Sequence, residues 1–297
     1  MVITNEMIKE AVGIDLKKPV EFKNLALINS NLSDVLSFVD HEKYISQLTR
    51  NKNVRGVFIT LLLAKKMANI PVEKIICDDP RFYFFSLYNY CANKNYKQKP
   101  STIHTSASIH PKAYVSDYNV LIGANVVVGP NVSILPDVEI GNDCLVRAGT
   151  VLGCDDAEIK CTSHGIFRVI HDGKLIIGER VEIGANCTID KGFSFQNTVI
   201  GDETKIANTT YIGHSVKIGK QCLLFGCTIS GSTIVQDNVR INPGAIITNQ
   251  VIIGKGAEVS LGAVVVQSVT PNEKVSGNFA MEHKKFMYNY AKIFGPF

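Results

Sequence analysis

The 297-residue sequence lacks several features that would assign it to large functional classes. It has no run of five or more Lys/Arg residues and a formal net charge of only +4, so nothing favours nucleic-acid binding. Its apolar run Val57–Ala64 is too short to span a bilayer, and Met1–Glu10 lacks the basic and apolar regions of a signal peptide. We therefore expect a globular protein that binds no nucleic acid and does not insert into membranes.

The dominant pattern is an aliphatic residue at every sixth position between Ile103 and Val265, often followed by glycine. Two of these repeats read Ile122-Gly-Ala-Asn-Val-Val and Ile183-Gly-Ala-Asn-Cys-Thr. A period of six fits neither a helix nor an alternating strand. It is typical of short parallel strands joined by tight turns, in coils that bury one another. The pattern predicts a mainly β protein built on a left-handed parallel β-helix of hexapeptide repeats.

The cysteines fit the same repeat. None of the eight forms a Cys-x-x-Cys pair. Cys144, Cys187 and Cys222 each stand four residues after a repeat-starting isoleucine, where other repeats carry valine or alanine. We expect small core residues here, with no disulfide or metal site, and a reducing cytoplasm as the compartment.

Residues 1–100 lack the six-residue period and form a separate domain. Arg55–Leu63 and Glu73–Cys77 are apolar runs of strand length. Asp79 is suited to cap a helix that begins at Pro80. These features predict a small α/β domain.

The β-helix is expected over residues 101–268, with interruptions at Gly153–Leu175 and Asp190–Val199. A solenoid accommodates insertions as loops on its outside, where repeat proteins often place binding residues. The remaining segment, 269–297, contains a helical pattern over Asn278–Ile293 that we expect to cap the last coil. Three residues share its apolar face: Phe286, Tyr290 and Ile293.

His214 is the histidine best placed for chemistry. It stands two positions after Ile212, where other repeats carry small or polar residues, so it should face outward near a coil corner. The alternative is a solvated surface imidazole without function. The other histidines replace glycine in early coils, lie in the long interruption, or lie outside the coils: His41, His104, His110, His164, His171 and His283.

Several motifs together resemble a known family. The sequence from Ile177 to Gly192 reads Ile-Gly-Glu-Arg-Val-Glu-Ile-Gly-Ala-Asn-Cys-Thr-Ile-Asp-Lys-Gly. Further matching segments are Leu36–Tyr44, Asp79-Pro80, Thr198–Gly201, Ile212–Ser215 and Ser276–Ala280. The pattern resembles the hexapeptide-repeat sugar-nucleotide N-acyltransferases, in particular the UDP-3-O-acylglucosamine N-acyltransferases of the lipid A pathway, over nearly the whole chain.

The resemblance implies a role for particular residues. His214 matches the catalytic general base, and Gly231, one coil further on, matches the glycine whose N–H stabilises the oxyanion. Phe38 and Tyr44, with His41 between them, match the residues that bind the uracil ring. The resemblance also implies a homotrimer with active sites between neighbouring β-helices. No cofactor is implied, because acyl-CoA or acyl carrier protein is a co-substrate.

The sequence departs from that family in four places. His41 replaces an asparagine, which leaves UDP and dTDP both open, and Asn249 replaces a second histidine. Asp155–Lys160 replaces a Gly-Phe-Gly-Phe element, and the family's extended C-terminal helices do not follow Phe297. These departures favour a relative that transfers an acyl group, such as a 3-hydroxyacyl group, from acyl-CoA to another nucleotide-linked amino sugar.

Other readings stay open. One alternative is the lipid A reaction itself, with acyl carrier protein as donor. A second is a hexapeptide protein that binds nucleotide sugars without catalysis. A third is an O-acetyltransferase or a zinc enzyme of the carbonic-anhydrase type on the same fold, which would need three convergent histidines.

Overall fold

The computed structural model describes residues 2–194, 196–277 and 280–294, and the chain divides into two compact units. The first comprises residues 1–100 together with 155–174 and 191–197. The second comprises 101–154, 175–190 and 198–297. The two interruptions of the hexapeptide period are therefore assigned mainly to the first unit, although the sequence boundaries placed them in the β-helix.

The first unit is built on a four-stranded parallel sheet of order β3-β4-β5-β6. A two-stranded antiparallel pair, β1-β2, and a hairpin, β16-β17, accompany it. Helices connect β4 to β5 and β5 to β6, which is the usual solution for parallel pairing, whereas a loop connects β3 to β4. The elements are β1 (Ile3–Thr4), α1 (Asn5–Val12), β2 (Glu21–Phe22), β3 (Asn24–Leu25), β4 (Val35–Val39), η1 (Glu42–Tyr44), α2 (Ile45–Arg50), β5 (Val54–Ile59), α3 (Leu61–Lys66), β6 (Glu73–Ile76), α4 (Pro80–Asn95), β16 (Ile159–Thr162) and β17 (Gly165–Arg168).

One apolar run has a different structure from the strand that its composition suggested. In Arg55–Leu63 the strand ends at Ile59, and Thr60 caps helix α3 by accepting a hydrogen bond from Leu63 N at 3.4 Å. The first helical residues, Leu61 and Leu62, are 59% and 68% exposed. The side chain of a threonine at this position can bond to the backbone of the next turn, which favours the start of a helix over a continued strand. Here it does so although the residues that follow are apolar.

The predicted start of the long helix is confirmed. Helix α4 begins at Pro80, and the side chain of Asp79 accepts a hydrogen bond from Phe82 N at 3.0 Å. Proline suits the first helical position because the N–H that it lacks has no partner within the helix.

The interruptions of the β-helix are folded segments of the first unit. The ring of His164, in the turn of the β16-β17 hairpin, stacks on Phe82 of α4 with centroids 3.9 Å apart. Val169 and Phe193 are 0% and 7% exposed and belong to the apolar core that includes Phe84. These segments therefore complete a core that residues 1–100 alone would leave open.

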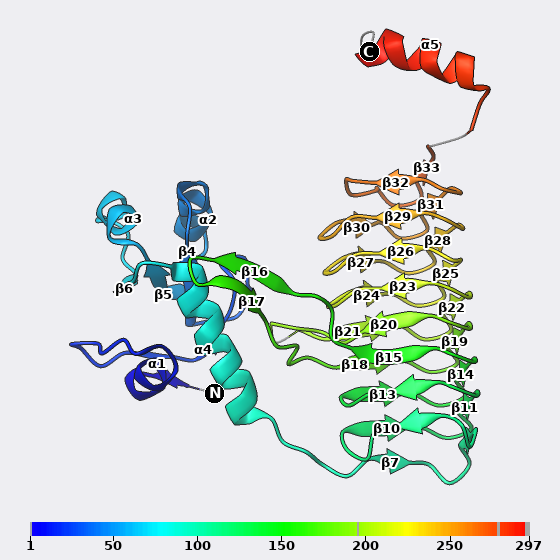
Figure 1. The fold of residues 1–297 in the computed structure, drawn as a ribbon, viewed down its shortest axis with the longest axis horizontal. Helices are drawn as coiled ribbons and strands as arrows, with labels where there is room; N and C mark the ends of the chain where they lie inside the picture. The colour runs from blue at the N-terminus through cyan, green and yellow to red at the C-terminus, as the bar shows by residue number, and fades with distance from the viewer. Residues whose placement is uncertain (1, 195, 278–279, 295–297) are drawn as a thin grey trace. The chain divides into compact units, whose positions relative to one another are not determined.

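The second unit is a parallel β-helix whose strands stack in three sheets, which Figure 1 shows as a ladder of coils. The first sheet contains β7 (Thr102–Ile103), β10 (Val120–Ile122), β13 (Val138–Ile140), β18 (Leu175–Ile177), β21 (Thr198–Ile200), β24 (Lys217–Ile218), β27 (Ile234–Val235) and β30 (Ile252–Ile253). The second contains β8 (Ser108–Ile109), β11 (Val127–Val128), β14 (Leu145–Val146), β19 (Glu182–Ile183), β22 (Lys205–Ile206), β25 (Leu223–Leu224), β28 (Arg240–Ile241), β31 (Glu258–Val259) and β33 (Lys274–Val275). The third contains β9 (Tyr114–Val115), β12 (Ser133–Ile134), β15 (Val151–Cys154), β20 (Thr188–Asp190), β23 (Tyr211–Ile212), β26 (Thr228–Ile229), β29 (Ile246–Ile247) and β32 (Val264–Val265).

The repeat-starting aliphatic residues form one continuous core along the coils. Cys144, Cys187 and Cys222 are each at most 2% exposed within it, so their predicted role as core residues is confirmed. Ile206 pairs with Leu224, whereas Ile212 pairs with Ile229, so the coil that ends at Ile229 is one residue shorter. The left-handed parallel β-helix predicted from the period is confirmed.

The last described element is helix α5 (His283–Phe294). Its Phe286 and Tyr290 rings contact each other with centroids 5.7 Å apart. Residues 278–279 of the helix expected over Asn278–Ile293, and residues 295–297, lie outside the described residues. A short C-terminal helix is thus present, and its capping of the last coil stays a prediction. Within the described part of the chain, every helix is too short or too polar to cross a bilayer.

Candidate active site

His214 lies at a corner of the β-helix, between β23 and β24, where its repeat position predicted it. The backbone here is fixed from two sides. The His214 carbonyl accepts a hydrogen bond from Ser232 N at 2.8 Å, and Ser215 N donates to Thr198 Oγ1 at 2.8 Å. The side chain is half-buried. A half-buried imidazole on a rigid corner is suited to transfer a proton at a defined point.

The imidazole of His214 lies against the backbone of Gly231 in the next coil. A Cβ atom added to Gly231 would be only 2.4 Å from His214 Nε2 and 2.5 Å from Cε1. Ile212 pairs with Ile229, which brings these two corner residues to the same place in successive coils. Any side chain at position 231 would therefore displace the ring, and glycine allows the close approach.

The N–H of Gly231 lacks the side-chain acceptor found at some other corners, although the N–H groups of Gly226 and Asp237 are likewise without a bonded acceptor among the described residues. At four corners, the N–H two positions after the repeat aliphatic donates to an Asn or Asp side chain of the next coil, at 2.7 to 3.1 Å. These pairs are Ala124–Asn142, Glu179–Asp202, Ala185–Asn208 and Lys220–Asp237. No acceptor among the described residues is bonded to Gly231 N, and the Asn249 side chain instead accepts from Thr248 Oγ1 at 3.3 Å. A backbone N–H without an acceptor can donate a hydrogen bond to a developing oxyanion. The imidazole beside it can accept a proton in the same reaction.

A buried carboxylate close to this corner was missed by the sequence reasoning. Asp190 is 2% exposed and accepts a hydrogen bond from Tyr211 Oη at 2.7 Å. Because Ile189 pairs with Ile212, Asp190 lies one coil from Gly213, the neighbour of His214. The signal was present in the repeat, because Asp190 stands directly after the repeat isoleucine, where many repeats carry glycine and the others carry no further carboxylate.

The first unit contains the three residues expected to bind a nucleotide base. Phe38 lies in β4, is half-buried, and contacts Phe84 and Phe85 with ring centroids 4.9 and 5.8 Å apart. Its ring therefore packs against the apolar core that includes α4. Part of the ring surface remains exposed, so Phe38 combines a core contact with a surface available for stacking.

His41 and Tyr44 follow the carboxyl end of β4. His41 is exposed and caps η1, with its Nδ1 accepting a hydrogen bond from Lys43 N at 3.1 Å. In the neutral ring the proton therefore resides on Nε2, which can donate outward. Tyr44 is half-buried against the cluster that includes Val39, whereas Phe38 packs against the other core cluster of this unit. The structure therefore brings His214 and Gly231 into contact, but it shows no direct contact between Phe38 and Tyr44.

Other reactive groups give no competing centre. No group of three or more His, Cys, Asp or Glu residues that could hold a metal occurs in residues 2–194, 196–277 and 280–294. All eight cysteines are free thiols. Burial raises the pKa of Cys77 to about 12 and that of Cys227 to about 12, so these thiols are protonated and weakly nucleophilic at neutral pH.

Sequence comparison connects this fold to a family of transferases. Residues 119–154 match the family model described as bacterial transferase hexapeptide (six repeats). The UDP-3-O-acylglucosamine N-acyltransferase of Methylorubrum extorquens (strain PA1) is 36% identical over 139 residues, which are 46% of this chain and 39% of that protein. The probable UDP-3-O-acylglucosamine N-acyltransferase 2, mitochondrial, of Arabidopsis thaliana is 38% identical over 133 residues, 44% of this chain and 43% of that protein. The resemblance to hexapeptide-repeat sugar-nucleotide N-acyltransferases is confirmed, over less than half the length of these relatives.

A solved structure is also similar. The UDP-N-acetylglucosamine acyltransferase from Campylobacter jejuni matches with a TM-score of 0.49 and 23% sequence identity, covering 60% of this chain and 72% of that one. Similarity at this level carries no argument about activity.

Proposed function

We propose that the protein is an N-acyltransferase, which moves an acyl group from a thioester to the amino group of a nucleotide-linked amino sugar. The observation that carries the proposal is the His214 imidazole packed against Gly231, whose N–H has no acceptor among the described residues. This arrangement provides a base for the attacking amine and a donor for the oxygen of the thioester carbonyl. Both are needed for aminolysis of a thioester.

The reaction balances without a cofactor. The sugar amine attacks the thioester carbonyl carbon, a C–N bond forms, and His214 accepts the proton that the nitrogen loses. The carbonyl oxygen becomes negative and is stabilised by the Gly231 N–H. When the intermediate collapses, the C–S bond breaks, and the proton passes from His214 to the departing sulfur. The products are an amide and a free thiol.

The names of the relatives favour UDP-3-O-acylglucosamine as acceptor over another amino sugar on UDP or dTDP. They thus support the lipid A reaction, the first alternative that the sequence leaves open, more strongly than transfer to another amino sugar. The acyl chain and the donor, acyl-CoA or acyl carrier protein, are not specified by those names. Eight free thiols agree with a cytoplasmic location.

The proposal is tested with a panel of nucleotide amino sugars and acyl thioesters, following thiol release and product mass. We expect thiol release that requires an amino-sugar acceptor and is fastest with UDP-3-O-acylglucosamine. Saturable binding of the nucleotide sugar without thiol release from any donor would instead support the non-catalytic alternative.

We propose that the nucleotide base binds in the first unit at Phe38, His41 and Tyr44. Stacking on Phe38 and hydrogen bonds from the Tyr44 hydroxyl and His41 Nε2 would distinguish a base from a simple anion. Phe38→Ala and Tyr44→Phe should each raise the acceptor KM about tenfold or more, with little change in the donor KM. Because Phe38 also contacts Phe84 and Phe85, circular dichroism and thermal unfolding must show that Phe38→Ala folds. An unchanged acceptor KM in folded variants would place the nucleotide elsewhere.

We propose a homotrimer, on the basis of the chemistry of the three β-helix sheets. The outward side chains of the first and third sheets include exposed aliphatic residues: Leu121, Ile234, Ile246, Ile252 and Val264, each 39 to 52% exposed. The second sheet also exposes Val127, at 45%, but it carries ion pairs, such as Lys205–Glu182 at 2.8 Å and Lys274–Glu258 at 3.0 Å. Apolar sheets favour contact with other copies, and charged ones favour solvent. His214 lies at the corner between the third and first sheets.

Light scattering at micromolar concentration should give three times the chain mass of 32.6 kDa. Replacing Ile234 and Ile252 with lysine should dissociate the trimer, whereas a charge change at Lys205 on the second sheet should not. A fully active monomer would contradict this assembly.

A further inference from the structure

Helix α5 carries most of the net charge of the chain. It contains Lys284, Lys285 and Lys292 and no Asp or Glu, whereas the whole chain has 31 basic and 27 acidic residues. With histidine neutral, the formal net charge is therefore +3 for these 12 residues and +1 for the rest of the chain. A basic helix that is also amphipathic is typical of elements that bind an anionic surface.

The three ammonium groups have no carboxylate partner. Among the described residues, none of the lysines of α5 forms an ion pair, and Lys292 Nζ instead lies over the Tyr288 ring, 4.3 Å from its centroid. Glu282, the acidic residue nearest in sequence, accepts hydrogen bonds from the backbone N–H groups of Lys284 and Lys285 at 3.1 and 3.0 Å. Because the lysine side chains are also exposed, they remain available to external anions.

The opposite face of α5 is apolar. Phe286, Met287 and Tyr290 stand at i, i+1 and i+4, which places them on one side of a helix. Lys285 and Lys292, seven residues apart, share the other side. The Phe286 and Tyr290 rings contact each other, yet Phe286 is still 46% exposed. This face is therefore available to a partner outside the helix.

We propose that α5 binds the surface of an anionic lipid membrane, with its apolar face among the acyl chains and its lysines at the phosphate groups. Helices with one basic and one aromatic face lie in the plane of such a surface. Tyr290 suits this position, because tyrosine is enriched where acyl chains meet head groups. The helix would not span the bilayer, in agreement with the finding that no described helix is long and apolar enough to do so.

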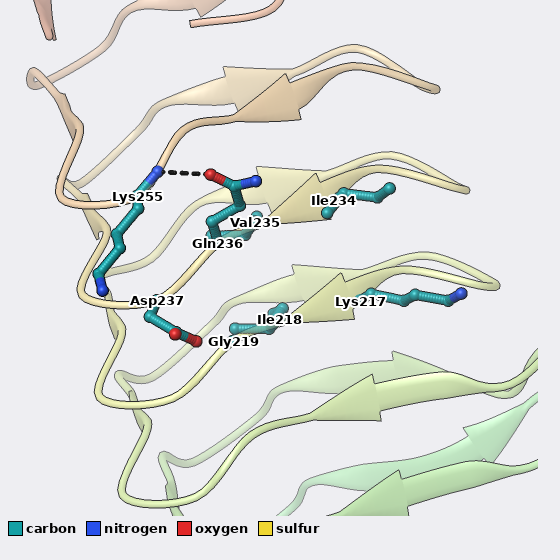
Figure 2. A pocket seen from close by; sticks show the side chains of 8 residues that line it. All are labelled: Lys217, Ile218, Gly219, Ile234, Val235, Gln236, Asp237 and Lys255. Atoms are coloured by element: carbon teal, nitrogen blue, oxygen red, sulfur yellow. Dashed lines mark hydrogen bonds between the residues drawn. The ribbon is translucent and has the colours of Figure 1, made fainter. Parts of the chain in front are cut away.

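A cationic hollow on the β-helix is a weaker candidate for an anionic surface. Lys217 and Lys255 line it, over β24, β27 and the corner after β30 (Figure 2). Ile234 also lines it, and this residue belongs to the aliphatic surface proposed to contact other copies of the chain. The hollow would be covered in that assembly, whereas the proposed contact does not include α5.

The competing arrangement is the one that the sequence predicts, in which α5 caps the last coil. Capping would cover the Phe286 ring whether or not lipid is present, whereas docking requires that the ring reach the lipid. The chain contains no Trp, so one introduced tryptophan reports on a single position of the helix. The two arrangements can therefore be distinguished by fluorescence.

The test titrates the full-length Phe286→Trp protein with vesicles of phosphatidylglycerol mixed equally with phosphatidylcholine, and with vesicles of phosphatidylcholine alone. We expect the emission to move to shorter wavelength with the anionic vesicles only, and the effect to weaken as salt is raised. Tyr288→Trp, on the lysine side of the helix, should respond much less.

Charge reversal tests the role of the lysines. Lys284→Glu together with Lys285→Glu should weaken sedimentation with the anionic vesicles about tenfold or more, because each lysine contributes to attraction by the negative surface. The matched control is Lys17→Glu together with Lys18→Glu, an adjacent and exposed pair in the first unit. This control should bind the vesicles as the wild type does.

The proposal is overturned if the anionic vesicles are not bound, if uncharged vesicles are bound equally well, or if both lysine pairs have the same effect. Emission of Phe286→Trp that is already at short wavelength without lipid, and does not respond to vesicles, would show that the last coil or another copy covers this face. A response to acyl carrier protein but not to vesicles would assign the helix to a protein partner. Vesicle binding requires no acyl transfer, so its failure would leave the proposed function unaffected.

Discussion

Replacing His214 with alanine is expected to lower kcat by about 10²–10⁴ while the protein stays folded. The imidazole is half-buried at a corner and contributes little to the apolar core, so its loss should affect chemistry far more than stability. The acidic limb of the kcat/KM profile, which reports a base that must be deprotonated, should disappear in the variant. Steady-state kinetics between pH 5 and 9 measure both effects.

The matched control is His110→Ala, at an exposed coil position whose Nδ1 accepts a hydrogen bond from Lys112 N at 3.1 Å. It should leave kcat unchanged. A His214→Ala enzyme within threefold of the wild type would mean that the amine reaches the site already neutral. Binding and the Gly231 N–H would then supply most of the rate, and the assignment of His214 as general base would be wrong.

Replacing Gly231 with alanine is expected to abolish most of the activity, by about 10²–10³ in kcat. The new Cβ would overlap the imidazole, since it would lie 2.4 Å from His214 Nε2. Either the ring must leave its position or the coils must separate, and the N–H is then no longer beside the base. Overpacking of this kind typically costs about 1–3 kcal/mol of stability.

A double-mutant cycle separates this effect from general damage to the coil. In the His214→Ala background the overlapping ring is absent, so Gly231→Ala should cost little or no stability there. Thermal unfolding of the four proteins gives the coupling between the two positions. An equal loss of stability in both backgrounds would show that the two residues do not touch as described.

The β-helix could be predicted from the sequence because its repeat is local. Each coil repeats the same six-residue pattern. When the pattern is shifted by one residue at Ile229, Gly231 aligns with His214 in the neighbouring coil. The strand predicted over Arg55–Leu63 is wrong beyond Ile59, because a short apolar run does not distinguish a strand from a helix. The threonine cap at position 60, which ends the strand, was the signal that decided it.

Other features depend on contacts between distant segments. The interruption after Gly153 gave no local sign that its hairpin would pack on α4, because the partner residues lie about eighty positions away, as for Asn89 and Ile170. The available N–H of Gly231 depends on the next coil, where Asn249 bonds to Thr248 instead of closing the corner. Asn249 occupies the same repeat position as Asn142 and Asn208, which do accept from the corner N–H, so the sequence gives no sign of this exception.

The central claim, transfer of an acyl group to nitrogen, is tested most directly by locating the acyl group in the product. The wild-type protein is incubated with UDP-3-O-acylglucosamine and a thioester whose acyl chain differs in length, and the product is treated with alkaline hydroxylamine, which cleaves oxygen esters, before mass analysis. We expect the new acyl group to survive this treatment, as an amide does, while the 3-O-acyl group is lost, and we expect the product to form at least about 100-fold more slowly with His214→Ala. A product that loses the new acyl group to hydroxylamine would be an ester, and it would contradict the account.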